Sequence, residues 1–364
     1  MPDFTELDVV MPVFNEGDHV SDAAAHLQIA AAHAGIKTRL IVVDDGSGPA
    51  DAAKLDVLAQ QGEIFLLRQP NSGRFLARSR GLAAARTRYV LLLDARVNLA
   101  ADALRRLRQE LLASEASHQV REVWNFHVQL ANTTSPWAAF WSGLTKVWWR
   151  QYWKNPRPVT INSANFNSYP KGTGAFFAPR ERLLAAVGEF SSSFDNPKLV
   201  SDDTGLLRSL AAVPGISLDP AVSCDYFGKD TPRKWSKQCF YRGTTFVDSY
   251  LGSVPWFGLL GILAGAGSAA LAGFALLHWH PRVVAGLALA GSAAAGGAVK
   301  ACGGTKGEAC AVGALTLPFG IIFGSGFLRG LALGCRAGYR KQSRPEETAA
   351  FSPQSFDPTV SQGE

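Results

Sequence analysis

The sequence predicts an α/β fold, with a mostly parallel sheet in residues 1–245 and transmembrane helices after it. Two observations support the α/β part: apolar runs typical of strands alternate with helical patterns, and each run ends in a polar turn. Such alternation indicates βαβ units and a parallel sheet. The third observation concerns the C-terminal part, because residues 251–279 contain no Asp, Glu, Lys or Arg.

The elements of the α/β part are expected in a regular order. Strands are expected within residues 7–17, 39–48, 63–73 and 89–93, and helices within 20–34, between the second and third strands, and within 74–88. A glycine-containing strand and a helix are expected again over residues 169–190.

Polar residues follow each of the four strands at its carboxyl end. They are Asn15-Glu16, Asp44-Asp45, Asn71–Gly73 and Asp94–Arg96. Ligands of such sheets bind beyond the carboxyl ends of the strands, so we expect these residues to converge on one crevice. Neither a dinucleotide fingerprint nor a phosphate loop follows the first strand, so the sequence lacks the usual signatures of those two cofactor classes.

Taken together, these motifs resemble the inverting family 2 glycosyltransferases, which have the Rossmann-like glycosyltransferase A fold. The resemblance covers about residues 7–245. It rests on Pro12-x-x-Asn15-Glu16, Asp44-Asp45-Gly46-Ser47, Asn71-x-Gly73, Ala77-Arg78 with Gly81, the strand ending at Asp94, Gly172-Thr173-Gly174, Ser201-Asp202-Asp203 and Gln238-x-x-x-Arg242-Gly243. Each motif is weak alone, whereas their order and spacing are specific. The resemblance implies a UDP- or GDP-linked sugar as donor and no nucleic-acid partner.

The resemblance also implies donor-binding roles for residues on the first three strands and the helix after them. Pro12, Val13 and Glu16 would border the nucleoside, and Asp44 with Asp45 would accept hydrogen bonds from the base or ribose. Arg78 would point toward the nucleotide. The alternatives are that the two carboxylates only cap the following helix and that Arg78 is a surface arginine.

One site residue departs from the family pattern. In the family, the second carboxylate of an Asp-x-Asp motif binds the divalent ion that bridges the diphosphate, but here that position is Arg96. An arginine can bind a diphosphate without a metal. We therefore expect Arg96 to replace Mg²⁺ or Mn²⁺ partly or wholly, with Asp94 holding ribose or a weak metal ion. The alternatives are a degenerate site, or an ion pair between Asp94 and Arg96, whose side chains would point the same way on an extended strand.

The catalytic residues implied by the resemblance are Asp203 as general base and Asp202 beside it. A helix N-terminus favours the ionised form of both carboxylates, as a base near neutral pH requires. Helix capping is the alternative role.

Two further segments are implied to clamp the donor and acceptor. Gly172, Thr173 and Gly174 would lie beneath the acceptor, although a structural loop is an equally good reading. Gln238 and Arg242 are four residues apart and share a helix face. Processive relatives have a spacing of three and a following Trp, where this chain has Gly243.

The membrane region is expected over residues 251–330, in two or three hydrophobic segments. About 20 apolar residues span a bilayer, a length that residues 251–279 exceed, whereas 283–299 are marginal and 309–328 contain Pro318. Basic flanks before and after this region predict an even number of crossings with both ends cytoplasmic. We expect a hairpin turning at His280–Arg282, with the third segment re-entrant or on the surface; three spans are the alternative. Residues 331–364 are expected to be a basic and then disordered tail.

The remaining expectations concern the membrane surface and the function. Residues 124–153 hold six of the nine tryptophans, mixed with Lys and Arg, and are expected to be interfacial or, alternatively, part of the core. A further interfacial helix is expected over residues 232–250.

The sequence thus predicts an inner-membrane glycosyltransferase whose acceptor is a glycolipid, a polyprenyl phosphate or a growing glycan. The second hypothesis is a catalytically weak subunit with a binding or scaffold role. The oligomeric state cannot be inferred.

Overall fold

The structure is a computed structural model that describes residues 4–118, 121–189, 194, 197–199, 202–248 and 280–343. The first hydrophobic segment, over residues 251–279, and the tail beyond residue 343 lie outside the described residues. The same is true of the expected hairpin between the first and second segments and of the expected disorder of the tail.

The α/β domain is built on one sheet with the strand order β3-β2-β1-β4-β8-β6-β9-β5, to which β7 is added beside β9. The strands are β1 (Glu6–Val13), β2 (Lys37–Asp44), β3 (Phe65–Arg68), β4 (Tyr89–Leu93), β5 (Val97–Leu99), β6 (Trp124–Leu130), β7 (Val159–Ile161), β8 (Ala175–Pro179) and β9 (Ile216–Tyr226).

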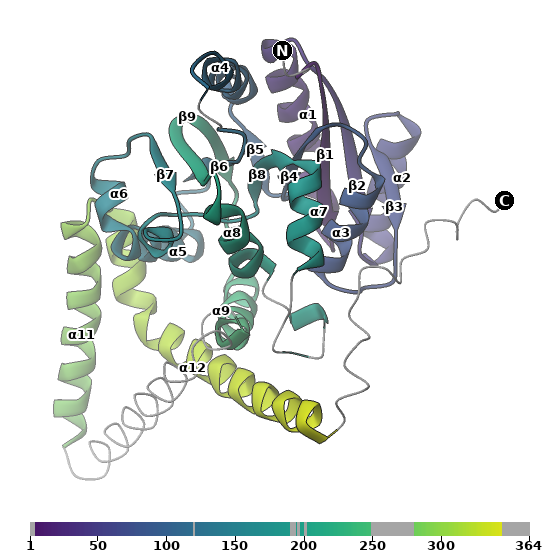
Figure 1. The fold of residues 1–364 in the computed structure, drawn as a ribbon. Helices are drawn as coiled ribbons and strands as arrows, with labels where there is room; N and C mark the ends of the chain where they lie inside the picture. Colours follow the sequence, from purple (N-terminus) through teal and green to yellow (C-terminus); the bar gives the residue numbers. More distant parts are fainter. Residues whose placement is uncertain are drawn as a thin grey trace.

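The helices of this domain cover the sheet (Figure 1). They are α1 (Gly17–Ala34), α2 (Pro49–Gln60), α3 (Arg74–Ala84), α4 (Ala103–Ala116), α5 (Pro136–Trp148), α6 (Arg150–Lys154), α7 (Arg180–Gly188), α8 (Asp202–Ala212) and α9 (Pro232–Phe246), with short 3₁₀ turns η1 (Phe166–Ser168) and η2 (Pro197–Leu199). The strands and helices expected in residues 7–93 and 169–190 are all present, so the predicted α/β class is confirmed.

The sheet is wholly parallel only in its first half, and its second half mixes one parallel pair, β6–β9, with antiparallel pairs. The pairs β3–β2, β2–β1 and β1–β4 are parallel, whereas β8 is antiparallel to both β4 and β6, and β9 is antiparallel to β5 and β7. The prediction of a mostly parallel sheet therefore holds for residues 6–93, and the whole sheet is mixed. The parallel half is the part that brings four carboxyl ends to one edge.

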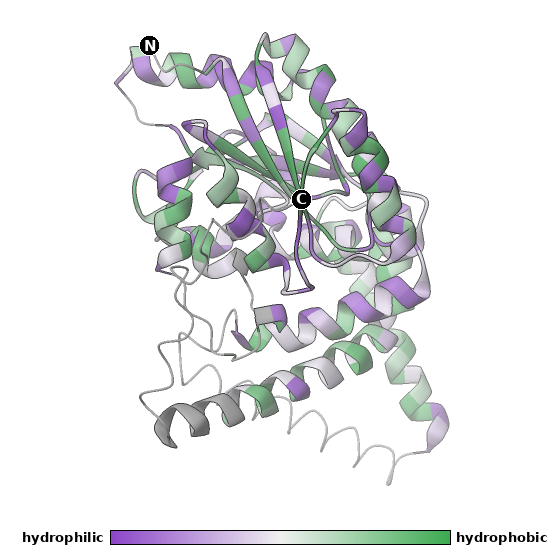
Figure 2. Cartoon of the chain, turned by 90° about the vertical axis from the view of Figure 1, so that its right-hand side faces the viewer, coloured by the Kyte–Doolittle hydropathy of each residue, from purple (hydrophilic) through white to green (hydrophobic). Residues whose placement is uncertain are grey.

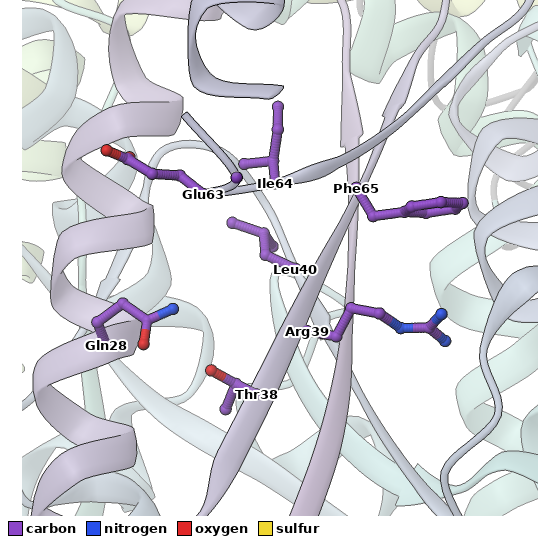
Figure 3. Close-up of a pocket in the computed structure, with 8 residues that line it drawn as sticks. Gln28, Thr38, Arg39, Leu40, Glu63, Ile64 and Phe65 are labelled. Atoms are coloured by element: carbon purple, nitrogen blue, oxygen red, sulfur yellow. The ribbon is translucent and has the colours of Figure 1, made fainter. Parts of the chain in front are cut away.

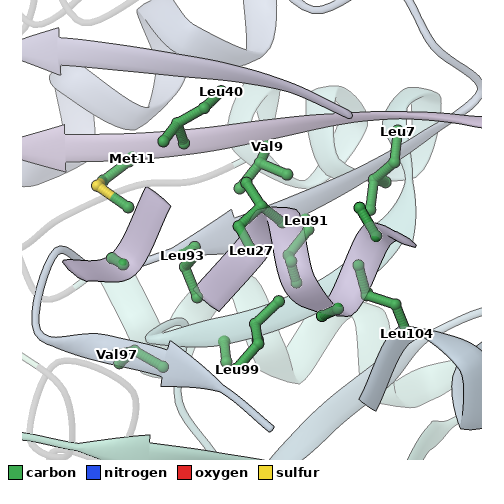
Figure 4. Close-up of a cluster of buried hydrophobic side chains, with 14 of the residues drawn as sticks. Leu7, Val9, Met11, Leu27, Leu40, Leu91, Leu93, Val97, Leu99 and Leu104 are labelled. Atoms are coloured by element: carbon green, nitrogen blue, oxygen red, sulfur yellow. The ribbon is translucent and has the colours of Figure 1, made fainter. Parts of the chain in front are cut away.

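Alternation along β1 places the core on both faces of the sheet. Leu7, Val9 and Met11 pack in a cluster with α1 and α4 (Figure 4), whereas Val10 faces a second cluster with α3, α7 and α8. Every residue of β4 is buried, as expected for a central strand covered by helices on both sides. This packing fixes the positions of the strand ends.

Two long apolar helices follow the α/β domain: α11 (Pro281–Ala301) and α12 (Lys306–Ser343). They lie beneath α5, α8 and α9 in Figure 1, and Figure 2 shows few hydrophilic residues along them. Residues Pro281–Ala301 and Lys306–Cys335 are each long and apolar enough to cross a membrane, and little of either is buried within the protein. The prediction of apolar C-terminal helices is confirmed for the second and third segments.

The third segment is neither isolated nor straight. Helix α12 contains Pro318, bends along its length, and packs against α11, α5 and α9 (Figure 1). A proline inside a helix removes a backbone hydrogen bond and is a common cause of such bends. The part of the chain after the bend therefore runs beside α9 of the α/β domain.

Glycines allow α9 and α12 to pack backbone against backbone. A Cβ atom on Gly243 would lie 2.2 Å from the carbonyl oxygen of Phe323, and one on Gly326 would lie 2.1 Å from that of Phe240. Neither position can hold a larger side chain without moving the helices apart. The glycine found where processive relatives have a Trp is thus explained by the close approach of α12.

Candidate functional site

The turn after β2 is held by its own first carboxylate. Asp44 is buried, and its Oδ1 accepts a hydrogen bond from the backbone N–H of Ser47 (2.9 Å), while its Oδ2 lies 3.4 Å from Arg68 Nε. Gly46 has φ +77°, and a Cβ there would lie 2.7 Å from the backbone nitrogen of Asn71. The turn therefore needs glycine both for its backbone angle and for its contact with the loop after β3.

Asp45 connects the same turn to that loop. One carboxylate oxygen accepts hydrogen bonds from Gln69 Nε2 (2.8 Å) and the N–H of Ser72 (2.7 Å), and the other accepts from the N–H of Gly73 (2.9 Å). The side chain is 4% exposed. Asp45 thus fixes the start of α3, which carries Arg78 toward the site.

The tip of β1 lies between the ends of β2 and β4. Val13 is opposite Asp44 in the parallel register, and its carbonyl oxygen accepts a hydrogen bond from the N–H of Asp45 (2.8 Å). Pro12 precedes it in the strand, and Glu16 lies just before the start of α1. The donor-binding residues predicted on β1 and β2 are therefore adjacent.

Asp94, directly after β4, is paired with arginines of α3. Its Oδ1 is 2.8 Å from Arg78 Nη2, and its Oδ2 is 4.0 Å from Arg74 Nη1. Arg78 is 4% exposed, so it is not the plain surface arginine of the alternative reading. Opposite α3, a Cβ on Gly174 would lie 3.4 Å from Asp94 Oδ2, which places residues 172–174 against this carboxylate.

The expected common direction of Asp94 and Arg96 is wrong. The chain turns after β4, with a hydrogen bond from the N–H of Val97 to the carbonyl oxygen of Asp94 (3.0 Å), so the residues are not on one extended strand. Arg96 instead donates to Glu16 Oε2 through Nε (2.8 Å) and to the carbonyl oxygen of Phe227 through Nη1 (3.2 Å). The alternative of an Asp94–Arg96 ion pair is therefore also wrong.

A second cation, Lys229, shares Glu16 with Arg96. Its Nζ donates a hydrogen bond to Glu16 Oε1. Burial lowers the pKa of Lys229, the hydrogen bond and charge of Glu16 oppose that shift, and the nearby Arg96 adds to it. Sequence reasoning missed Lys229, because its only signal is its place after β9, a strand that the patterns did not predict.

The side chains at this edge of the sheet do not match an ordinary divalent-metal site. Mg²⁺ and Mn²⁺ are bound through carboxylates and phosphate oxygens, but the only carboxylate predicted for this task, Asp94, is paired with arginine. Among the described residues, no group of three His, Cys, Asp or Glu side chains could hold a metal ion. The cation Arg78 is paired with Asp94, and the cations Arg96 and Lys229 are paired with Glu16.

The predicted base lies at the start of α8. This helix begins at Asp202 and continues through Asp203, so both residues lie in its first turn, as expected; their side chains are outside the description. The loop from 172 to 174 is anchored by a hydrogen bond from the N–H of Gly172 to Asn125 Oδ1 (2.9 Å), and Thr173 is fully buried.

Gln238 and Arg242 lie on α9, as predicted, and Arg242 contacts α5. The guanidinium of Arg242 lies 4.1 Å from the ring centroid of Trp141, close enough for a cation–π interaction. Gln238 Oε1 is buried and has no hydrogen-bond partner. Arg242 is therefore part of the contact between α5 and α9.

Several tryptophans of residues 124–153 pack inside the protein. Trp124 is fully buried in β6, and Trp137 and Trp141 of α5 pack with Trp235 of α9 and residues of α12. Trp148, by contrast, is 64% exposed. The segment thus joins the α/β domain to a candidate membrane helix; whether it also contacts lipid stays a prediction.

A cavity of about 300 Å³ lies elsewhere, between the amino ends of β2 and β3 (Figure 3). It is lined by Gln28, Thr38, Arg39, Leu40, Gly62, Glu63, Ile64 and Phe65. None of the residues predicted from sequence lies there, and ligands of such sheets bind at the carboxyl edge. We therefore assign the functional site to the cluster around Glu16 and Asp94.

Comparisons with known proteins agree with this fold. Residues 8–168 match the model of the family "Glycosyl transferase family 2". The structure of the mannosyltransferase PcManGT from Pyrobaculum calidifontis, in complex with GDP-Man and Mn²⁺, is similar with a TM-score of 0.52 and 15% identity, over 85% of this chain and 86% of that one. The structure of S. aureus TarS 1–349 with UDP-GlcNAc matches with a TM-score of 0.42 and 11% identity, over 86% of this chain and 92% of that one. No curated protein matches the sequence.

The strand order and the similar structure define an α/β domain with a glycosyltransferase A-like fold. More specifically, residues 8–168 match the family 2 glycosyltransferases, which identifies a glycosyltransferase domain in this part of the chain.

Proposed function

We propose that this protein is a membrane-anchored, inverting glycosyltransferase. It moves a sugar from a UDP- or GDP-linked donor to a membrane-associated acceptor, which is a glycolipid, a polyprenyl phosphate or a growing glycan. The observation that supports the proposal is the set of charged residues at the carboxyl edge, where Asp44 and Asp45 lie beside β1, Arg78 is paired with Asp94, and Arg96 and Lys229 are paired with Glu16.

Each part of this cluster suits one part of a nucleotide sugar. The strand tips at Val13 and Asp44 offer carbonyl and carboxylate oxygens to a base and ribose. The buried arginines and Lys229 offer cationic N–H donors to a diphosphate, and such charge-assisted hydrogen bonds are among the strongest in proteins. A diphosphate leaving group needs this stabilisation because negative charge grows on it as the bond to the sugar breaks.

Inverting transfer is a single displacement at the anomeric carbon. An acceptor oxygen forms the new bond while the bond to the diphosphate breaks, and the nucleoside diphosphate departs with the electron pair. When the acceptor is an alcohol, Asp203 takes its proton. The position of Asp203 in the first turn of α8 favours the ionised form that this role requires.

The membrane anchor is proposed from α11 and α12. Both are candidate spans, and α12 is also packed against α5 and α9 of the catalytic domain. The catalytic domain is placed on the cytoplasmic side of the inner membrane because basic residues flank the apolar region on both sides.

A thermal-shift screen of UDP- and GDP-sugars, each with and without Mn²⁺, tests this proposal. One donor is expected to stabilise the protein, and Asp203→Asn should keep that shift while losing transfer to an alcohol acceptor. If no nucleotide sugar stabilises the wild-type chain, the enzyme assignment fails and the second hypothesis, a scaffold subunit, is favoured.

A further inference from the structure

Two cations near the loop before β8 have no carboxylate partner among the described residues. The Nζ of Lys171 lies 4.1 Å from the ring centroid of Phe166, and the guanidinium carbon of Arg208 lies 5.0 Å from the same centroid. The ion pairs found among the described residues include neither cation. Lys171 is partly buried and Arg208 is exposed, and the positive charge of Arg208 disfavours the charged form of Lys171.

The surroundings of Lys171 leave one of its N–H donors available. Its Nζ donates to the carbonyl oxygens of Phe166 and Tyr169, and an ammonium group has three donors. Burial, and then the charge of Arg208, lowers the pKa of Lys171 to about 8. The ring of Trp149, centred 5.9 Å from Nζ, forms another wall, and its buried indole nitrogen has no hydrogen-bond partner.

The chain connects this cation pair to two parts of the candidate site. Lys171 precedes Gly172, in the loop that reaches Asp94 through Gly174. Arg208 is on α8, the helix whose first turn holds Asp203. Arg96 and Lys229, which suit the donor diphosphate, are instead tied to Glu16.

We propose that Lys171 and Arg208 form a binding site for a phosphate group carried by the acceptor. The inference rests on the proposed function, since it names the chemical class of that acceptor. Phosphate is a suitable ligand because its oxygens accept charge-assisted hydrogen bonds from an ammonium and a guanidinium. Among the three acceptor classes, it favours phosphate-bearing lipids over neutral glycans.

The test uses the full chain in phosphatidylcholine nanodiscs, with geranylgeranyl phosphate, geranylgeraniol and inorganic phosphate as separate probes. The wild type is expected to bind the prenyl phosphate at least tenfold more tightly than the alcohol or free phosphate. Lys171→Met and Arg208→Gln should each raise the Kd for the prenyl phosphate about tenfold. The control Lys37→Met, at the exposed start of β2, should not.

The pH dependence of the affinity for prenyl phosphate is a second measurement. A lysine with a purely structural role would not affect it. Above pH 7.5 a phosphate monoester is already doubly charged, so its own titration adds little. Lys171 loses its proton as the pH rises through about 8, with Arg208 as the charged neighbour that lowers its pKa. Affinity should therefore fall between pH 7.5 and 9 in the wild type and stay constant in Lys171→Arg.

Three results would overturn the inference. Equal affinity for prenyl phosphate and the alcohol would show that Lys171 and Arg208 do not bind the phosphate group. If inorganic phosphate binds as tightly as the lipid, the site binds a free anion rather than the acceptor. Variants that only unfold at lower temperature, with unchanged Kd, would leave Lys171 a structural residue. Nucleotide-sugar binding, measured in parallel, should be unchanged in both variants; its absence in the wild type would instead refute the proposed function.

Discussion

At the residue scale, the adjacent carboxylates Asp44 and Asp45 at the end of β2 have different structural roles. Asp44 stabilises its own turn, whereas both oxygens of Asp45 are used by Gln69, Ser72 and Gly73. Asp45 therefore supports the site by fixing the loop before α3. Its predicted hydrogen bonds to base or ribose stay a prediction and would have to be made beside these three.

The same scale yields a prediction for Lys229. Lys229→Met should weaken binding of the nucleoside diphosphate about tenfold or more, because a hydrogen bond to a charged group contributes roughly 1.5–3 kcal/mol. Binding of the nucleoside without phosphates should not change. Isothermal titration with both ligands checks this, and Lys229→Arg should restore most of the affinity. An equal loss for nucleoside and diphosphate would instead indicate general damage to the site.

At the element scale, the packing of α12 on α9 depends on single glycines. Gly326→Ala places a methyl group against the carbonyl oxygen of Phe240, whereas Gly324, two residues earlier, has nothing within 4 Å of its Cβ position. We expect Gly326→Ala to destabilise the protein by about 1–3 kcal/mol, as overpacking does, and Gly324→Ala to be neutral or slightly stabilising.

Thermal unfolding of the two alanine variants in detergent measures this difference. Limited proteolysis, as a second measure, should show faster cleavage next to α9 in Gly326→Ala alone. Two variants with the same melting temperature would contradict the close packing of α9 and α12.

The parallel half of the fold was predictable because its signal is local. Each of β1, β2 and β4 is an apolar run that ends in a polar turn, and a buried central strand such as Tyr89–Leu93 needs no partner information to be recognised. The antiparallel strands β5, β7 and β9 were not predicted, because they are short or mixed in polarity and are defined by pairing partners distant in sequence.

The candidate site could likewise be predicted from sequence only where the signal is local. Sequence motifs brought Asp44, Asp94 and Arg78 to one edge, as the structure does. The partner of Arg96 could not be inferred, since Glu16 is 80 residues away and the chain turns between Asp94 and Arg96. Pairing across such distances depends on tertiary packing, which the pattern around Asp94 does not contain.

At the scale of the whole molecule, apolar side chains remain exposed on the two C-terminal helices. Leu289 of α11 is 69% exposed, and Ile321 of α12 is 72% exposed. Surfaces of this kind are stable when lipid covers them. Leu289→Asp and Ile321→Asp should each reduce membrane integration, because an aspartate near a helix centre costs about 2.5–3.5 kcal/mol on insertion.

Alkaline carbonate extraction of membranes measures that integration. The matched control is Val57→Asp, which replaces a similarly exposed side chain (51%) on α2 of the catalytic domain and should leave extraction unchanged. A wild-type chain that carbonate removes completely would show that α11 and α12 do not anchor the protein.

The central claim is that Arg96 partly or wholly replaces a divalent metal ion in binding the donor diphosphate. It is tested most directly by titrating UDP and GDP into the full chain in excess chelator. We predict that the wild type still binds one of them, that Arg96→Gln weakens this binding at least tenfold, and that Arg88→Gln, at the opposite end of β4, does not. Binding that vanishes with chelator, returns with Mn²⁺ and is indifferent to Arg96 would contradict the claim.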